Sequence, residues 1–332
     1  MTNEMPDLVD IQVIRRGIKS RKRMDNIFIG VGLGSLAFSL GVLLVLIGKL
    51  LVEGGKRLFG QGIAGLWNFL TSVPDSNPEV AGIKIAIIGS FCVILLTAII
   101  AVPLGIGAGI FLEEYAGRGD LPIPFPKWMS NIIEINISNL AGVPSIIYGL
   151  LAMGLFKYQL RLGETIATAG LTLALLILPI IIVTTREAIK AVPQALREGV
   201  YAIGASRWQM IWDHILPASA GGILTGLIVG LSRAIGEAAP LVTIGALTFI
   251  TFPPPFPFSP KLVGEGLHGP FDWLFSPFTV MPIQVFDWVS RPRPEFSVVN
   301  AGAAAVVLVV MTLSMNALAI YLRIYFRKRV KW

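Results

Sequence analysis

Long apolar stretches constrain this chain more than any other feature. Each is about 20 residues or longer, the length that an α-helix needs to cross a bilayer. They span residues 27–47, 83–112, 132–156, 166–185, 221–249 and 296–325. Charged residues make up only 14% of the 332 residues, whereas a soluble protein usually carries about a quarter. The sequence therefore predicts an all-α polytopic membrane protein with six transmembrane helices.

The apolar stretches also predict how the chain is divided. Residues 1–26 form a polar, basic N-terminus, and residues 27–82 hold the first span and the segment after it. Residues 83–326 hold the other spans, and residues 327–332 form a basic tail. No small-residue cleavage site follows the first stretch, so we interpret it as a retained span and not as a signal peptide.

The distribution of basic residues predicts the orientation in the membrane. Most of the 27 Lys and Arg residues lie in the terminal segments and in the loops on the same side of the predicted spans. Cytoplasmic loops carry such an excess, so we expect both termini in the cytoplasm. The net charge of +7 then reflects topology, and no nucleic-acid partner is expected.

Two connections between the predicted spans are unusually long. The cytoplasmic connection, residues 186–220, has a helical pattern. The external connection, residues 250–295, is rich in proline, which forbids regular helix or central strand through most of it. We expect an ordered loop there, with a short amphipathic helix near residues 283–289. Residues 56–70 predict a further helix at the membrane surface.

The sequence lacks the common motifs of enzymes. It has no phosphate-binding loop of the form G-x-x-x-x-G-K-[ST], and no H-E-x-x-H or G-x-S-x-G motif. His214 and His268 are predicted on opposite sides of the membrane, so they cannot share a metal ion. The single cysteine, Cys92, cannot form an intrachain disulfide. We expect no catalytic residue, no metal site and no ATP site in this chain.

Arg233 lies deep inside a predicted span, four residues before Glu237. This spacing puts both side chains on one face of a helix, with Arg233 about 18 Å from residue 221 at 1.5 Å per residue. Inserting an arginine at that depth costs roughly 2.5–3.5 kcal/mol, so the residue needs a compensating role. One interpretation is an anion contact in a translocation path. The other is a structural ion pair that locks two helices.

The same predicted helix carries a small residue at every fourth position. These residues are Gly222, Gly226, Gly230, Ala234 and Ala238. Small side chains let the backbones of membrane helices approach closely. The stripe therefore predicts a tight helix–helix contact beside Arg233, and Pro240 predicts a weakened helix just beyond Glu237.

Residues 142–150 predict a kinked helix in the third span. Pro144 cannot donate to the helical ladder, and Gly142 and Gly149 have no side chains. Irregular backbone inside a membrane is tolerated only against protein or water. The kink is therefore either a packing feature or, with Asn139 and Ser145, part of a polar path.

The cytoplasmic connection contains a candidate docking element. Its pattern predicts a charged helix, a glycine turn and a second short helix, defined by Glu198, Gly199, Gly204, Ala205, Leu216 and Pro217. Trp208 and Trp212 lie close by, and a solvated linker would not need such large apolar residues. We expect an interface with another protein or with the membrane surface.

These residues resemble the cytoplasmic signature of permease subunits of bacterial ATP-binding-cassette (ABC) importers, E-A-A-x-x-x-G-x(9)-I-x-L-P. Glu198, Gly204 and Leu216-Pro217 fit the spacing. The chain departs from it at Gly199 and Val200, which replace the alanines, and at His214, which replaces the isoleucine.

Three further segments resemble phosphate permeases in particular. Residues 142–150 are similar to the G-[VI]-P-S-x-x-Y-G segment of these proteins, and residues 233–241 to the R-A-x-G-E-x-A-P-L segment of the PstA-type subunit. The external run 276–288 is also similar to PstA-type chains. The resemblance extends from about residue 83 to the C-terminus.

The resemblance implies a type I ABC importer permease with a cytoplasmic coupling helix, in the bacterial inner membrane. The implied partners are a second permease subunit of the PstC type, a PstB-type dimer that binds ATP and Mg, and a PstS-type phosphate-binding receptor. Glu198 and Gly204 fall in the coupling helix. Arg233 and Glu237 match charged residues implicated in phosphate passage. Phosphate is the implied substrate.

The sequence leaves three other functions open. The chain could be a permease for another oxyanion or small solute. A secondary transporter is a second alternative, although such proteins commonly carry internal repeats around a midplane site and this sequence shows no clear repeat. The third alternative is a membrane-embedded enzyme or a sensor without transport.

Overall fold

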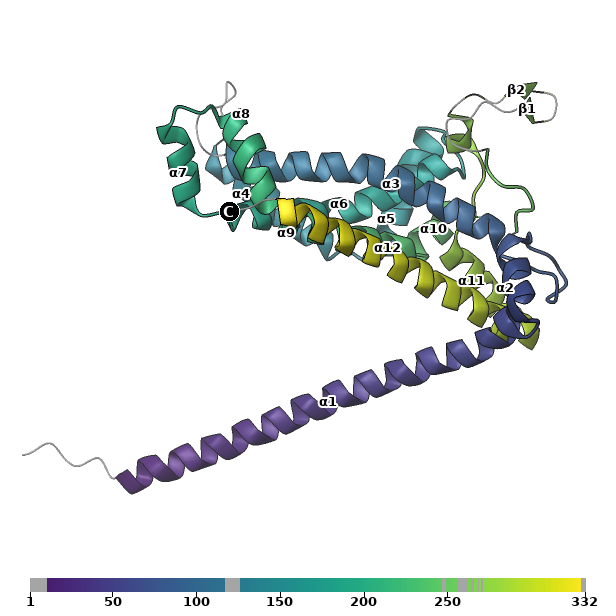
Figure 1. The fold of residues 1–332 in the computed structure, drawn as a ribbon, viewed down its shortest axis with the longest axis horizontal. Coiled ribbons are helices and arrows are strands. Elements are labelled where there is room, and N and C mark those ends of the chain that lie inside the picture. Colours follow the sequence, from purple (N-terminus) through teal and green to yellow (C-terminus); the bar gives the residue numbers. More distant parts are fainter. Residues whose placement is uncertain are drawn as a thin grey trace, which may run out of the picture. The chain divides into compact units, whose positions relative to one another are not determined.

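The computed structural model describes residues 11–116, 126–246, 249–255, 262–263, 266–267, 269 and 271–329. It is almost entirely helical (Figure 1). Residues Met1–Val52 and Glu53–Trp332 form two separate units, and each is described by itself.

The first unit consists of most of the long helix α1 (Ile11–Phe59), which ends in the second unit. The segment Arg21–Phe59 is long and apolar enough to cross a membrane, and it contains the expected first span. Lys56 and Arg57 lie in the last turn, where positive charge complements the helix dipole. After a turn, α2 (Gly62–Thr71) follows, so the helix expected at residues 56–70 is the end of α1 plus a second helix.

Three helices form the centre of the second unit. They are α3 (Lys84–Ile110), α6 (Ile166–Lys190) and α9 (Leu216–Gly236). α6 packs between α3 and α9, and α12 (Ala301–Arg329) packs against α9. The small-residue stripe faces α6, since a Cβ at Gly226 would lie 2.5 Å from Cβ of Thr184. The close helix–helix contact expected beside Arg233 is therefore present.

The third predicted span is not a single straight helix. α4 (Lys127–Ala141) is followed by α5 (Ser145–Ala152) and the π-helical segment η2 (Met153–Gln159), and the two parts are bent by 103°. The described residues contain five helices that are long and apolar enough to cross a membrane, or six if the bent pair is one span. Pro144 explains the break, because its ring disfavours helical backbone before it.

The fifth predicted span, 221–249, was wrong at both ends. α9 begins at Leu216 and ends at Gly236, and the short helix α10 (Ala239–Ile244) follows after Glu237 and Ala238. Pro240 explains where α9 ends: it has no N–H for the carbonyl of Gly236, and its ring clashes with that carbonyl in a continuous helix. A turn at Gly245, with a φ of 95°, ends α10.

The connection between α6 and α9 lies at one end of the second unit (Figure 1). It contains α7 (Gln194–Ala202), α8 (Arg207–Gln209) and the π-helical turn η3 (Met210–Ile215). A second π-helical turn, η1 (Phe111–Tyr115), ends α3 and packs against α6.

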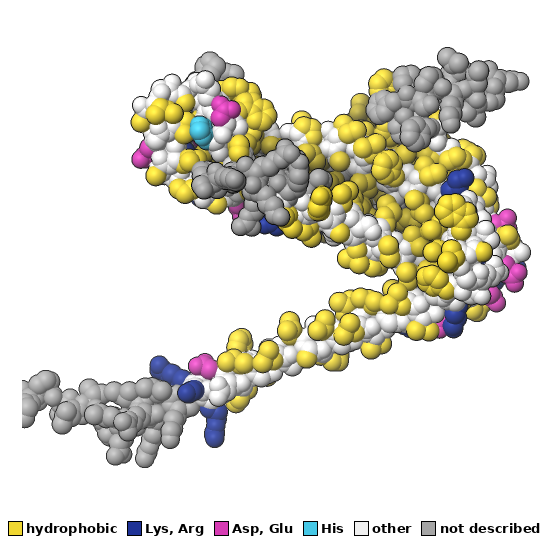
Figure 2. All heavy atoms as spheres, viewed as in Figure 1, with side chains coloured by type: hydrophobic (Ala, Val, Ile, Leu, Met, Phe, Trp, Pro, Cys, Tyr) yellow, Lys and Arg dark blue, Asp and Glu magenta, His cyan; other side chains and the backbone are white. Residues whose placement is uncertain are grey.

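The opposite end of this unit holds α2 and α11 (Met281–Val289). α11 matches the helix expected near residues 283–289. The neighbouring elements are β1 (Leu262–Val263), which pairs antiparallel with β2 (Gly266–Leu267), a 3₁₀ turn, η4 (Asp272–Phe275), and a π-helical turn, η5 (Glu295–Asn300). On the face shown in Figure 2, charged side chains of this unit gather toward its two ends and apolar side chains cover the middle. This arrangement is typical of a membrane-spanning bundle.

Candidate functional site

Arg233 and Glu237 meet where α9 ends. Arg233 lies in the last turn of α9, and Glu237 follows the final residue with extended backbone. The Nε group of Arg233 donates a 3.2 Å hydrogen bond to Oε1 of Glu237. The spacing argument therefore paired the right side chains, although it placed Glu237 inside a helix. Arg233 stands about 26 Å from the start of α9 at 1.5 Å per residue, because the helix begins earlier than expected.

The exposure of this pair leaves the guanidinium accessible. The side chain of Arg233 is 38% exposed, and that of Glu237 is 17% exposed. Within the described part of the chain, the terminal NH₂ groups of Arg233 have no hydrogen-bond partner. A guanidinium presents a planar set of donors that fits two oxygens of an oxyanion. The pair can therefore hold Arg233 through Nε while its outer edge contacts an anion.

The bend between α4 and α5 lies close to this pair. α5 packs against α10, and a Cβ at Gly149 would lie 2.7 Å from Cα of Pro240. The Tyr148 hydroxyl donates a 2.8 Å hydrogen bond to the carbonyl of Leu140, across the bend. The bent helix pair therefore packs against the segment that directly follows Glu237.

The expected kink residues have different places in the structure. Gly142 ends α4 and donates its N–H to the carbonyl of Asn139 at 3.0 Å, and Pro144 directly precedes α5. Gly149 is not at the kink, contrary to our expectation. It lies inside α5, where the lack of a side chain permits the close approach of α10.

Asn139 and Ser145 flank the bend. Asn139 is exposed on α4, and Ser145 is the half-buried first residue of α5. Among the described residues, no hydrogen bond joins either side chain to Arg233 or Glu237. Of the four expected pathway residues, only Arg233 and Glu237 are joined by a hydrogen bond in the described part of the chain.

The candidate docking element has the expected helix–turn–helix form. Glu198 and Gly199 are exposed on α7, Gly204 makes the turn with a φ of 82°, and Ala205 follows it. Ser206 then caps α8: its hydroxyl accepts from the N–H of Gln209, whose side chain accepts from the N–H of Ser206. Leu216 and Pro217 begin α9.

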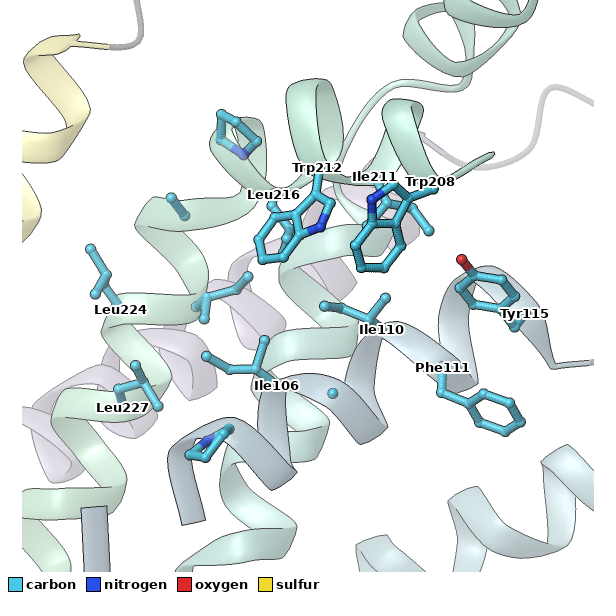
Figure 3. A pocket seen from close by; sticks show the side chains of 15 residues that line it. Ile106, Ile110, Phe111, Tyr115, Trp208, Ile211, Trp212, Leu216, Leu224 and Leu227 are labelled. Atoms are coloured by element: carbon cyan, nitrogen blue, oxygen red, sulfur yellow. The ribbon is translucent and has the colours of Figure 1, made fainter. Parts of the chain in front are cut away.

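An apolar groove of about 920 Å³ runs beside this element (Figure 3). Side chains of α3 and η1 form one wall, and those of α8, η3 and α9 form the other. Trp208 and Trp212 pack edge to face at 5.4 Å between ring centroids. Because the lining is almost wholly apolar, an anion would lose its hydration there without compensation. The groove is therefore no candidate for the anion site.

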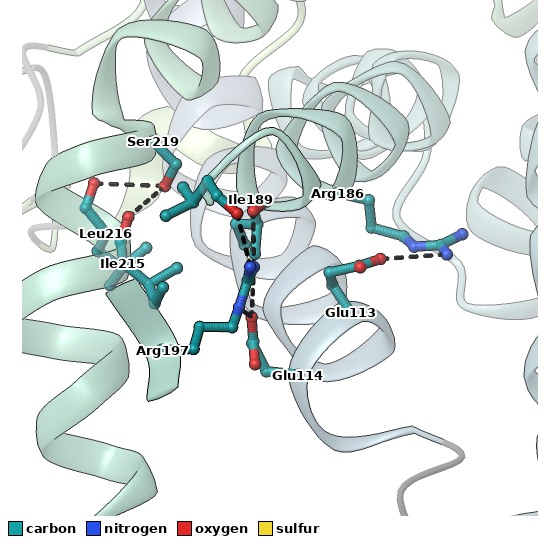
Figure 4. A network of polar contacts seen from close by, with 9 residues as sticks. Glu113, Glu114, Arg186, Ile189, Arg197, Ile215, Leu216 and Ser219 are labelled. Carbon is teal, nitrogen blue, oxygen red and sulfur yellow. Dashed lines mark hydrogen bonds and ion pairs between the residues drawn. The ribbon is translucent and has the colours of Figure 1, made fainter. Parts of the chain in front are cut away.

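A buried ion pair that the sequence did not predict joins α7 to η1 (Figure 4). The Nε and one terminal NH₂ group of Arg197 each donate to Oε1 of Glu114 at 3.1 Å. The Glu114 side chain is fully buried, and the Arg197 side chain is 6% exposed. The guanidinium also donates to the carbonyls of Val192 at 2.6 Å and Ile189 at 2.8 Å. No local spacing predicts this pair, since its members are 83 residues apart.

A second arginine lies beside this pair. Arg186 on α6 contacts Glu113 of η1 at 3.3 Å and Glu134 of α4 at 2.9 Å. Among the described residues, no cluster of side chains has the composition of a metal site. The ion pairs of Arg186 join α6 to η1 and to α4.

Comparison with known proteins identifies a family. Residues 101–332 match the family described as binding-protein-dependent transport system inner membrane component. The chain is 30% identical to the phosphate transport system permease protein PstA of Yersinia pestis, over 93% of this chain and 92% of that protein. It is 34% identical to a probable ABC transporter permease protein, YqgH of Bacillus subtilis, over 56% of this chain and only 60% of that protein.

Solved structures show the same fold at low sequence identity. A chain of a bacterial alginate ABC transporter, solved with its alginate-bound periplasmic protein, superposes with a TM-score of 0.61 at 15% identity, over 93% of this chain and 98% of that one. A chain of the MetNI methionine ABC transporter gives a TM-score of 0.54 at 13% identity, over 74% of this chain and 97% of that one.

These matches confirm two expectations from the sequence: the resemblance to PstA-type permeases, and an all-α type I importer permease fold. The multi-pass arrangement in the membrane agrees with both. The chain belongs to the family of binding-protein-dependent transport system inner membrane components.

Proposed function

We propose that this chain is the permease subunit of an ATP-driven importer of inorganic phosphate. The observation that carries the proposal is the Arg233–Glu237 pair at the broken end of α9. It presents a guanidinium edge on a helix of a membrane bundle, and a relative that matches along most of the chain is named a phosphate permease.

Electrostatics favours an anion at this position. Two opposite unit charges 4 Å apart attract by about 4 kcal/mol at an effective dielectric constant of 20. Glu237 offsets part of this attraction, because it is held 3.2 Å from Nε. A partly neutralised cation suits transport, since an anion must bind strongly enough to enter and weakly enough to leave.

The energy for transport comes from a partner in this proposal. The sequence has no phosphate-binding loop, and the relatives are permease subunits. We assign ATP and Mg to a PstB-type subunit dimer. The second half of the pathway belongs to a PstC-type permease, and a PstS-type receptor delivers phosphate from outside.

The α7–turn–α8 element is the proposed coupling element. Glu198 and Gly199 are exposed on α7, and the turn at Gly204 directs the chain from α7 into α8. We assign the element and both termini to the cytoplasmic side, because the distribution of basic residues predicts that orientation. The opposite end, with α2 and α11, then faces the outside of the bacterial inner membrane.

Two measurements test the proposal. The chain, purified from bacterial membranes with its native partners, is expected to retain an ATP-hydrolysing subunit. Membrane vesicles containing the complex and the receptor are expected to take up labelled phosphate in an ATP-dependent manner. Competition by unlabelled phosphate but not by sulfate or molybdate supports phosphate as the substrate. Competition by either of the others instead identifies a permease for another oxyanion.

Uptake that survives ATP depletion and collapses with the proton gradient would overturn the proposal in favour of a secondary transporter. Absence of any ATP-hydrolysing partner, together with absence of uptake, would favour the sensor or membrane-enzyme alternatives.

A further inference from the structure

Two consecutive glutamates lie in η1, the π-helical turn after α3, and they contact different parts of the molecule. Glu114 contacts Arg197 of α7, and Glu113 contacts Arg186 of α6 (Figure 4). Arg186 also contacts Glu134 of α4. We call these five residues (Arg197, Glu114, Glu113, Arg186 and Glu134) the glutamate relay. Polar contacts thus run from α7 through η1 and α6 to α4.

The first contact of the glutamate relay is built to hold one geometry. Arg197 makes four hydrogen bonds in a buried environment: two to Glu114 and one each to the carbonyls of Ile189 and Val192. Ile189 lies in the last turn of α6, and its carbonyl also accepts from the N–H of Val192 at 3.1 Å. A buried charge that loses its partner is strongly destabilised, so α7, η1 and the end of α6 are held in a fixed arrangement.

The Arg197–Glu114 contact joins α7 to η1 and so to α3, a helix that is not adjacent to α7 in the sequence. α7 lies between α6 and α9 in sequence, so movement of α7 acts directly on those two helices. η1 and α3 precede this connection by some 80 residues. An apolar cluster that includes Val200 and Ile211 also packs near Ile110 and Tyr115, but apolar surfaces allow sliding, whereas directed hydrogen bonds fix position.

The second contact extends from η1 to the bent helix pair. Arg186 lies between Glu113 and Glu134, and the Glu134 side chain is 47% exposed. α4 continues from Glu134 to the bend at Pro144, and α5 beyond it packs against α10 beside Glu237. Polar contacts therefore connect η1 to α4, so that a displacement of η1 can reach the bent helix pair beside the candidate anion site.

We propose that the glutamate relay transmits displacement of α7 to α4, with Glu114 and Arg197 as the primary positioning residues. The proposal rests on the proposed function, because it takes α7 as the element that a nucleotide-binding partner moves. It adds the path by which that movement reaches the bend between α4 and α5.

The test uses one reporter thiol on α4 in the assembled complex. Ser138 is exposed on α4 and borders a polar pocket of about 140 Å³ with Glu134 and Arg186. Ser138→Cys in a Cys92→Ala background gives a single thiol in this chain. Its rate of modification by a water-soluble maleimide is measured without nucleotide and with ATP plus vanadate. ATP hydrolysis is measured on the same samples.

With an intact relay, nucleotide is expected to change the modification rate. With Glu114→Gln, that change is expected to be lost while ATP hydrolysis continues. Glu113→Gln leaves the buried Arg197–Glu114 pair intact and weakens the contact with Arg186. It is expected to abolish the nucleotide-dependent change in the modification rate as well, so it replaces Glu114→Gln if that variant fails to assemble. Glu295→Gln is the matched control, because it makes the same charge change at an exposed position of η5, outside the polar pocket that Ser138 borders, and should leave the response intact.

Two results separate the possible failures. If nucleotide changes the rate equally in the intact and both relay variants, the relay proposal is wrong and the proposed function is untouched. If the intact chain shows no nucleotide response and retains no ATP-hydrolysing partner, the proposed function itself is overturned, and the relay proposal with it.

Discussion

Replacing Arg233 by alanine tests the anion contact most sharply, because the structure separates two possible costs. The ion pair with Glu237 is an i,i+4 pair with the Arg233 side chain 38% exposed. Such pairs contribute about 0.3–0.5 kcal/mol, so the abundance of the protein should change little. A lost hydrogen bond to a charged group costs about 1.5–3 kcal/mol. At 1.4 kcal/mol per factor of ten, phosphate passage should fall by roughly 10- to 150-fold.

The assay is the initial rate of labelled phosphate uptake into vesicles with matched amounts of the complex. Arg233→Lys keeps the charge but loses the planar pair of donors, so its rate should fall between those of the native chain and Arg233→Ala. Arg291→Ala is the matched control. Arg291 also forms an i,i+4 ion pair, 2.8 Å from Asp287, but lies at the α11 end, far along the chain from α9.

Uptake by Arg233→Ala within about twofold of the native rate, at normal abundance, would refute the reasoning, because a loss that small corresponds to less than one hydrogen bond to a charged group. An equal fall in both alanine variants would also refute it. That result would mean that any broken ion pair impairs the complex.

Three further predictions concern the backbone around the two sites. Gly149→Ala places a Cβ 2.7 Å from Cα of Pro240, and overpacking costs about 1–3 kcal/mol. The melting temperature of the purified complex should therefore fall. An unchanged melting temperature would contradict the packing of α5 on α10. Gly204→Val forces a β-branched residue to a φ of 82° at a cost of about 1–2 kcal/mol. The amount of phosphate transported per ATP hydrolysed should therefore fall. Asparagine tolerates this backbone conformation, so Gly204→Asn should keep the native ratio. Tyr148→Phe removes the 2.8 Å bond to the Leu140 carbonyl, worth about 0.5–1.5 kcal/mol; thermal stability should fall modestly, and an equal melting temperature would show that the bond does not hold the bend.

The helices that follow from the sequence are those set by length and apolarity alone. α6 contains the span expected at residues 166–185. α3 continued by η1 covers all but the first residue of the span expected at 83–112, and η5 continued by α12 covers the span expected at 296–325. Local chemistry also located the breaks, since Pro144 and Pro240 stand where α5 begins and where α9 cannot continue. These features depend only on neighbouring residues, so the sequence displays them directly.

Other features depend on distant contacts and could not be predicted. The 103° bend is an angle, and a proline in the sequence marks its place without giving its size. The sequence alone predicts Gly149 as a kink residue, because it does not reveal that α10 packs against this position. The distance of Arg233 from the start of its helix is longer than the sequence predicts. α9 begins at Leu216, directly after η3, and the sequence does not show this junction.

The candidate site shows the same division. The spacing of Arg233 and Glu237 predicted their contact, because i,i+4 neighbours meet whether or not the helix ends between them. The Glu114–Arg197 pair joins residues 83 apart, and only the folded chain brings them together. A consecutive Glu113-Glu114 at the end of an apolar stretch was the one signal available.

The central claim is ATP-driven phosphate import through a complex that contains this chain. The most direct measurement is accumulation of labelled phosphate in proteoliposomes that hold the purified complex, with the receptor outside and ATP on the α7 side. The account predicts accumulation that requires ATP and is at least about tenfold lower with Arg233→Ala. Phosphate flux that ignores ATP, or ATP-dependent uptake of another solute with none of phosphate, would contradict it.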